Sequence, residues 1–201
     1  GTEDENMSPE TLVKIRRDEQ LASAKILGVK DVRFLPFEDG GMYDEVALRI
    51  EIAKVIAEIK PDVVIGPDHK LYPESHPDHL RVGEAVSKAY FMCSNVNMMK
   101  SVGATQIAKP TVLAYYFTGK PNRFVKITKK DFEKTKAAYA CFVSQCPPPD
   151  NGKSLMLYMR LKVRLNGLRS FHIRADAFRV MNNMHIHCCG EAEDTAIRRP
   201  L

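Results

Sequence analysis

The sequence has 201 residues, enough for one domain with its own hydrophobic core or for a large part of a bigger one. Hydrophobic residues make up 44% and charged residues 27%, which excludes a wholly disordered or fibrous chain. The net charge of +5 comes from scattered lysines and arginines, so we expect solvated faces and no nucleic-acid partner. The chain has no apolar run of membrane-spanning length, and its polar, acidic first residues are unlike a signal peptide. We therefore expect no membrane span and a cytoplasmic location.

The cysteines form an odd set of five without the spacing of a disulfide framework: Cys93, Cys141, Cys146, Cys188 and Cys189. The adjacent pair at the end would form a disulfide only with strain, so we expect reduced thiols, as in a reducing compartment. Together with His185 and His187, that pair is too crowded for a tetrahedral metal site. We interpret this tail as a strand with buried thiols.

The first half of the chain alternates helical and strand-like segments. Ser8-Pro9-Glu10 is a typical helix start, and Gly28 stands where a helix C-terminal glycine would, which predicts a helix between them. Short apolar runs predict buried strands over 32–35 and 62–66, and a helix is predicted over 44–60. Helices and strands in alternation with short connections are typical of a parallel sheet.

The second half is less regular. Its predicted elements are a loop-rich crossover over 95–110, strands over 111–117 and 123–127, helices over 128–142 and 153–169, and one or two short strands within 177–189. The strand over 123–127 fits either a hairpin with the strand before it or a late sheet edge. We predict an α/β, Rossmann-like fold with a mostly parallel sheet, helices on both faces and one domain over 1–201.

The most informative stretch is Tyr72-Pro73-Glu74-Ser75-His76-Pro77-Asp78-His79, which follows the second predicted strand. Open α/β sheets place ligand sites beyond the carboxyl ends of their strands. Because His76 and His79 are three residues apart, their side chains can reach a common point on a first helical turn. Pro77 and Asp78 also suit an ordinary helix start without any chemistry. A metal site needs about three protein ligands, and this stretch supplies one or two.

The same stretch resembles the His-Pro-Asp-His segment of the zinc-dependent PIG-L/LmbE-like N-acetylglucosaminyl deacetylases, and so does the Lys60-Pro61-Asp62-Val63-Val64 run before it. Residues 16–29 resemble the family's Arg-x-x-Glu helix, and residues 34–40 resemble its next strand and Asp-bearing loop. Residues 115–122 and 178–181 are most similar to the archaeal diacetylchitobiose deacetylase branch. The resemblance covers about 1–145 well and the tail loosely.

The resemblance implies a hydrolase that removes N-acetyl groups from N-acetylglucosamine-containing sugars, with zinc as cofactor. It implies that His79 is a zinc ligand. It also implies that His76 stabilises the tetrahedral oxyanion or protonates the leaving amine, and that Asp78 tunes His76. The implied substrate-binding residues are Arg16, Asp39 and, in a looser match, His187.

Two departures from the family pattern stand out. Relatives often have a tyrosine two residues before the first histidine, where this chain has Glu74. The family also binds zinc mainly through an Ala-His-Pro-Asp-Asp-Glu-type segment, which supplies two ligands and the general base and does not occur in this sequence. Residues 1–6 resemble the loop after the family's second strand, so we expect the first strand, helix and second strand to be missing and the 201 residues alone to be inactive.

Two alternatives to a zinc deacetylase remain open. A non-catalytic, sugar-binding remnant of the same fold would keep Arg16, Asp39 and His76 and would bind sugar without turnover. A hydrolase that used His76 and Asp78 without a metal would leave His79 without a role as ligand. For the zinc deacetylase and for the sugar-binding remnant, the expected partner is an N-acetylated amino sugar. A homo-oligomer is also compatible with the sequence.

Overall fold

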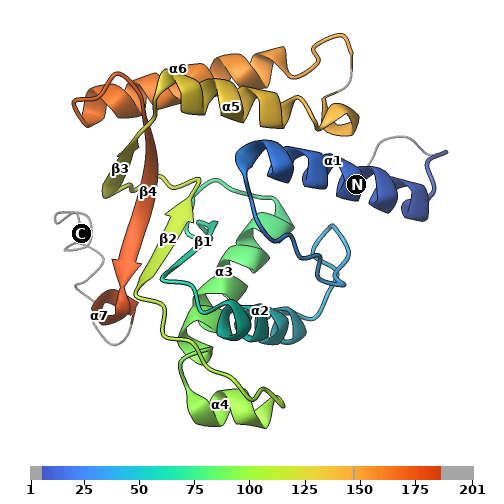
Figure 1. Ribbon diagram of the computed structural model, residues 1–201, viewed down its shortest axis with the longest axis vertical. Helices are drawn as coiled ribbons and strands as arrows, with labels where there is room; N and C mark the ends of the chain where they lie inside the picture. The colour runs from blue at the N-terminus through green and yellow to red at the C-terminus, as the bar shows by residue number, and fades with distance from the viewer. Residues whose placement is uncertain (1–5, 147, 187–201) are drawn as a thin grey trace. The chain divides into compact units, whose positions relative to one another are not determined.

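The computed structural model describes residues 6–146 and 148–186 (Figure 1). By its internal contacts the chain divides into two compact units, residues 1–34 with 125–176 and residues 35–124 with 177–201. The prediction of one domain over 1–201 stays a prediction. No helix in the described ranges is both long and apolar enough to cross a membrane.

The first unit is built mainly from helices α1 (Pro9–Leu27), α5 (Lys129–Tyr139) and α6 (Lys153–Arg169) and the short 3-10 helix η1 (Val143–Gln145). The predicted ends of α1 are confirmed: the Ser8 hydroxyl accepts a hydrogen bond from the Thr11 amide at 3.2 Å, and Gly28 follows in the left-handed conformation with φ 82°. A capping box of Thr128 and Asp131 begins α5, which packs against α1.

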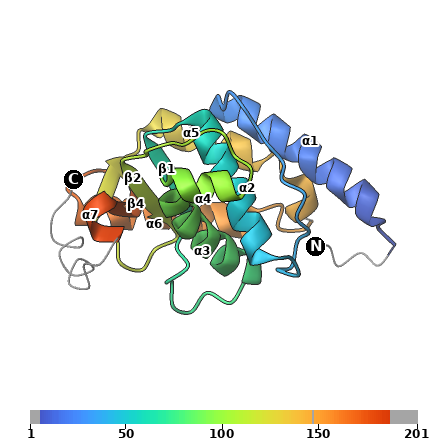
Figure 2. The ribbon, with the colours of Figure 1, turned by 90° about the horizontal axis from the view of Figure 1, so that it is seen from below.

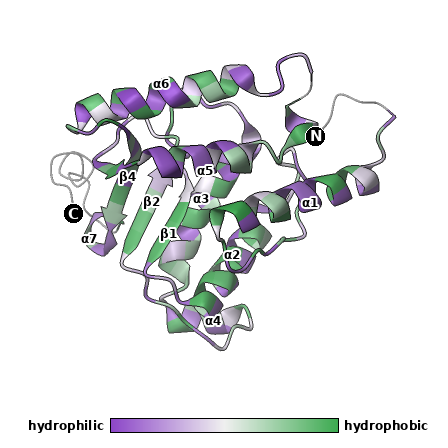
Figure 3. Cartoon of the chain, turned by 45° about the horizontal axis from the view of Figure 1, so that its top comes forward, coloured by the Kyte–Doolittle hydropathy of each residue, from purple (hydrophilic) through white to green (hydrophobic). Residues whose placement is uncertain are grey.

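The second unit contains α2 (Glu45–Ile59), β1 (Val63–Pro67), α3 (Pro77–Met92), α4 (Val96–Ser101), β2 (Val112–Tyr116) and α7 (Asn183–Ile186). Strands β1 and β2 pair in parallel, and α3 packs against both α2 and β1 (Figures 1 and 2). Strand β1 is coloured largely hydrophobic in Figure 3, as expected for a strand with a helix against it. The core of this unit includes the fully buried Leu113, Cys93 and Met99.

The strands form one sheet in the order β1-β2-β4-β3, in which β3 is Arg123–Lys126 and β4 is Ala175–Asn182. The α/β class and the parallel pair are confirmed, and the sheet is mixed because β4 runs antiparallel to β2. Since β4 lies between β2 and β3, the hairpin alternative is wrong and the sheet-edge alternative is confirmed.

Three local predictions are corrected by the structure, the first entirely and the other two in part. Residues 32–35 form no strand, and Phe34 is 38% exposed. The Arg17 guanidinium lies over the Phe34 ring, 4.5 Å from its centroid, in a cation–π contact. The predicted crossover over 95–110 contains α4, whose N-cap is Asn95. The Asn95 side chain accepts hydrogen bonds from the backbone amides of Asn97 and Met98. Of the one or two strands predicted within 177–189, one is confirmed as β4, whereas residues 184–186 belong to α7, and His187, Cys188 and Cys189 lie outside the described residues. The cysteines that are described, Cys93, Cys141 and Cys146, are free thiols.

Candidate active site

The His-Pro-Asp-His segment lies where α3 begins, a few residues beyond the C-terminal end of β1. His76 is the N-cap of α3, because its Nδ1 accepts a hydrogen bond from the Asp78 amide at 3.3 Å. Gly83, about two turns further along, allows α3 to approach β1 closely, since a Cβ at this position would collide with the Pro67 carbonyl oxygen. The close approach of helix and strand thereby places the two histidines beyond β1, as the sequence predicts.

The rings of His76 and His79 are stacked, with centroids 4.6 Å apart and planes 23° from parallel. Phe117 follows β2, and its ring lies against that of His79, with the two ring centroids 5.9 Å apart. The side chains of His76 and His79 are 49% and 43% exposed, so a substrate can reach both of them from solvent.

One carboxylate contacts both histidines. Glu74 Oε1 accepts a hydrogen bond from the His76 amide at 2.8 Å, and Glu74 Oε2 lies 2.9 Å from His79 Nδ1. The hydrogen bond with His79, followed by the one from the His76 amide, holds the pKa of Glu74 below its ordinary value of 4.5. Glu74 is therefore a carboxylate at neutral pH.

A second carboxylate, that of Asp78, holds the loop containing Asp39 against the start of α3. Asp78 Oδ2 accepts a hydrogen bond from the Gly40 amide at 2.8 Å. Burial by itself would raise the pKa of Asp78, but the Gly40 and Gly41 amides, the nearby Tyr43 hydroxyl and His76 lower it below its ordinary value. Burial, with a contribution from Asp78, raises the pKa of Tyr43 to about 12, so Tyr43 stays a neutral phenol.

These contacts produce a group of side chains that could hold a metal ion. Ligand atoms of Asp39, His76 and Asp78 all lie within 4.8 Å of one another. Imidazole nitrogens and carboxylate oxygens are donors that zinc accepts in proteins, so the set fits a divalent cation. The predicted ligand His79 does not belong to this group, although its ring is stacked on that of His76. Its role as a zinc ligand stays a prediction.

The other predicted site residues are distributed unevenly. Asp39 lies beside His76 and Asp78, as the sequence predicts for one site. Arg16 lies on α1 in the first unit, and His187 is outside the described residues, so their contacts with a sugar stay predictions. Sequence reasoning counted Glu74 among the acids around the two imidazoles and as a departure from the family pattern, but did not pair it with His79, because the four intervening positions change from loop to helix.

A buried ion pair supports the segment that leads to the histidines, and the sequence did not predict it. Asp68 directly follows β1, and its two carboxylate oxygens lie 2.5 and 2.9 Å from Nη2 and Nε of Arg179 on β4. The Arg179 guanidinium also lies over the Tyr115 ring, 4.3 Å from its centroid. Asp68 further accepts a hydrogen bond from the Lys70 amide, so the pair fixes the first turn of the chain after β1.

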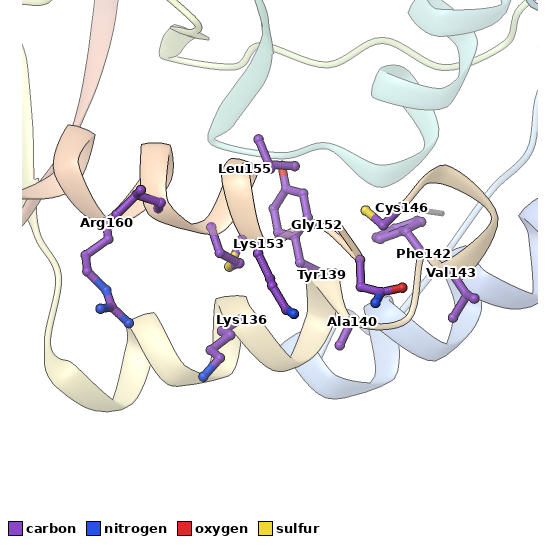
Figure 4. Close-up of a pocket in the computed structure, with 13 residues that line it drawn as sticks. Lys136, Tyr139, Ala140, Phe142, Val143, Cys146, Gly152, Lys153, Leu155 and Arg160 are labelled. Atoms are coloured by element: carbon purple, nitrogen blue, oxygen red, sulfur yellow. The ribbon is translucent and has the colours of Figure 1, made fainter. Parts of the chain in front are cut away.

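The first unit has a separate cavity of about 460 Å³ beside α5, η1 and α6 (Figure 4). Its walls carry Tyr139, Phe142 and Met156, with Lys136, Lys153 and Arg160 among the polar side chains. Among the described residues that line it there is neither a carboxylate nor an imidazole. The cavity therefore lacks the two commonest kinds of general base, histidine and a carboxylate, both of which occur around His76.

Comparison with known proteins shows which family and which relatives the chain resembles. Residues 1–90 match the family described as PIG-L: GlcNAc-PI de-N-acetylase. The chain is 33% identical over 193 residues to diacetylchitobiose deacetylase of Thermococcus kodakarensis, covering 94% of this chain and 71% of that protein. Over 84 residues it is 38% identical to a probable N-acetyl-alpha-D-glucosaminyl L-malate deacetylase 2 of Bacillus anthracis, covering 40% of this chain and 35% of that protein.

A solved structure resembles the fold along most of the chain. It is the N,N'-diacetylchitobiose deacetylase from Pyrococcus horikoshii, complexed with an inhibitor. The TM-score is 0.83 and the sequence identity 30%, over 94% of this chain and 72% of that chain. The α/β architecture described above is therefore that of a known deacetylase.

Proposed function

The chain belongs to the PIG-L family of de-N-acetylases, and we propose that it acts on N-acetylglucosamine-containing sugars, removing the acetyl group with zinc as cofactor. The observation that carries this proposal is the stacked pair of His76 and His79 beyond β1, in a chain 33% identical to a diacetylchitobiose deacetylase. Bound zinc would polarise the acetamide carbonyl and make a water molecule nucleophilic near neutral pH.

His76 is proposed to donate a hydrogen bond to the oxygen that becomes negative as the acetamide is attacked. Because its Nδ1 accepts the Asp78 amide, a neutral His76 carries its hydrogen on Nε2, which is then available as a donor. The Asp78 carboxylate lies 3.8 Å from His76 Nδ1 and would stabilise positive charge on the ring when His76 carries a proton to the leaving amine. Asp39 and Arg16 are proposed to contact sugar hydroxyls.

His79 is proposed to hold the zinc, and the rest of the zinc site is expected from a further segment. The sequence contains no Ala-His-Pro-Asp-Asp-Glu segment, so the general base and two ligands that the family resemblance implies do not occur among these residues. We therefore expect no turnover by the 201 residues alone. An extended chain, preceded by such a segment from a relative, is expected to be active.

The position of bound zinc tests the assignment of His79. Anomalous diffraction from zinc-soaked crystals of the extended chain is expected to place the ion about 2.0–2.1 Å from His79 Nε2. A His79→Asn variant should lose the anomalous peak, whereas the matched variant His172→Asn, in the first unit, should keep it. Zinc held by Asp39, His76 and Asp78 with His79 outside its coordination sphere would overturn the assignment.

A second candidate function is sugar binding without turnover, in which Arg16, Asp39 and His76 would contact the sugar. Calorimetry with diacetylchitobiose separates the two functions: binding that a chelator leaves unchanged, with no acetate release by the extended chain, would favour the second.

A cytoplasmic location is also part of the proposal, since the three described cysteines are free thiols, and cell fractionation tests it.

We also propose that copies of the chain associate. Leu157, Leu161 and Leu165 are each more than half exposed and are spaced four residues apart on α6. This spacing places them on one face of the helix, and Figure 3 shows hydrophobic colour recurring along it. A Leu161→Lys variant should sediment as a smaller species than the unchanged chain; equal sedimentation would refute a contact through this face.

A further inference from the structure

We propose that Glu74 is a positioning residue that fixes His79 in the Nδ1–H tautomer, so that the Nε2 lone pair is available to a metal ion. The 2.9 Å contact between Glu74 Oε2 and His79 Nδ1 is the observation that motivates it. The inference rests on the proposed function only in identifying that ion as the zinc of a deacetylase.

The chemistry of the contact determines where the hydrogen lies. An ionised carboxylate can only accept hydrogen bonds, so the hydrogen between Glu74 and His79 belongs to Nδ1 of the imidazole. Glutamate side chains are ordinarily ionised near neutral pH, and the other oxygen of Glu74 already acts as an acceptor, for the His76 amide at 2.8 Å. A neutral imidazole has one N–H, which leaves Nε2 of His79 with a free lone pair. Histidines that bind metals commonly donate their other N–H to a carboxylate in this way.

The neighbouring ring has the opposite arrangement. His76 Nδ1 accepts the Asp78 amide, which requires the hydrogen of a neutral His76 to be on Nε2. Two rings stacked 4.6 Å apart therefore present different groups, a lone pair on His79 and an N–H on His76. The first suits a metal ligand and the second a donor to an oxyanion. Both residues are histidines, so residue type does not separate the two roles. The local hydrogen bonds do separate them.

Glu74 is well placed to keep this arrangement. Its side chain is 20% exposed, against 43% for His79, so the acceptor is better shielded from water than the ring it orients. Its other carboxylate oxygen accepts the His76 amide at 2.8 Å, which anchors the side chain to the residue that caps α3. A rotation of Glu74 away from His79 would therefore also break this second bond.

Tautomers measured by ¹H–¹⁵N NMR test the proposal on the metal-free 201-residue chain, at about pH 9, where histidines are neutral. We expect His79 to carry its hydrogen on Nδ1 and His76 on Nε2. Glu74→Ala should move the His79 hydrogen to Nε2 in a substantial fraction of molecules. Glu74→Gln has one acceptor oxygen in place of two: with that oxygen on the His76 amide, its NH2 group faces His79 Nδ1, so this variant should also move the hydrogen to Nε2 while it keeps the start of α3, which controls for folding. An unchanged His79 tautomer in Glu74→Ala would overturn the proposal.

Zinc affinity, measured by competition with a chromophoric chelator on the extended chain, is the second readout. Glu74→Ala should weaken zinc binding about 10- to 100-fold, as for other outer-shell partners. The matched control is Glu84→Ala, which removes a carboxylate that pairs with Lys88 on the same helix and should leave the affinity unchanged. If His79→Ala does not weaken zinc binding, the proposed role of His79 fails, while the NMR result still decides whether Glu74 fixes its tautomer. Equal affinity in Glu74→Ala and Glu84→Ala would refute the effect on metal binding.

Discussion

Replacing Arg179 with methionine is expected to lower the free energy of unfolding by about 3–5 kcal/mol, because it leaves the Asp68 carboxylate buried without its partner. The side chains of Arg179 and Asp68 are 6% and 3% exposed, so water cannot replace the lost hydrogen bonds. The substitution also removes the cation over the Tyr115 ring. Urea denaturation at pH 7, followed by circular dichroism, measures the loss.

Two further variants control for other causes. Lys88→Met removes the exposed pair with Glu84 and should cost at most about 1 kcal/mol. The double variant Asp68→Leu/Arg179→Met lacks both partners. It should recover much of the free energy of unfolding that Arg179→Met loses, because no uncompensated charge is then buried. A loss in Arg179→Met no larger than that in Lys88→Met would contradict a stabilising role for the buried pair.

The same pair predicts acid sensitivity. Burial would raise the pKa of Asp68, but the hydrogen bonds with Arg179, Thr118 and the Lys70 amide, together with the charge of Arg179, hold the pKa below its ordinary value of 3.8. The folded state thus releases this proton more easily than the unfolded chain does. The stabilisation is therefore fully present above the ordinary value and is lost as the pH falls through the lowered one. Arg179→Met should show a smaller loss of stability between neutral and acid pH than the unchanged chain.

Replacing His76 with asparagine in the extended chain is expected to reduce kcat by about 10²–10³-fold, the usual effect of removing one oxyanion donor. Asparagine is a good N-cap, so α3 should still begin at Pro77 and the fold should be kept. Acetate release from diacetylchitobiose measures the change. Because the proposed hydrogen bond forms only as the oxygen becomes negative, KM should change little.

The neighbouring variant Ser75→Ala serves as the control for His76→Asn. Ser75 is exposed and is not proposed to take part in the reaction, so kcat should stay close to that of the unchanged chain. A higher KM with an unchanged kcat in His76→Asn would assign His76 to substrate binding and remove it from the chemistry.

The sequence predicts best what neighbouring residues determine. Ser8 and Gly28 mark the ends of α1 because capping is local, and the position of His76 and His79 follows from a strand that precedes a helix start. The apolar run over 32–35 favours a strand but forms none, because a strand needs a partner that only the folded chain provides.

Contacts between distant residues could not be predicted. The placement of β4 between β2 and β3 brings together segments far apart in the chain, and this places Arg179 beside Asp68. The contact between Glu74 and His79 depends on the turn before α3, which residue spacing does not define. The assignment of roles to the two histidines therefore required both the family resemblance and the geometry.

Acetate release from diacetylchitobiose in the presence of zinc is the measurement that tests the central claim most directly. We expect the extended chain to release acetate and to stop when a chelator removes the metal, and we expect the 201 residues alone to release none. Robust turnover by the 201 residues alone, or release by the extended chain that a chelator leaves unchanged, would contradict a zinc-dependent deacetylase whose site is shared with a further segment.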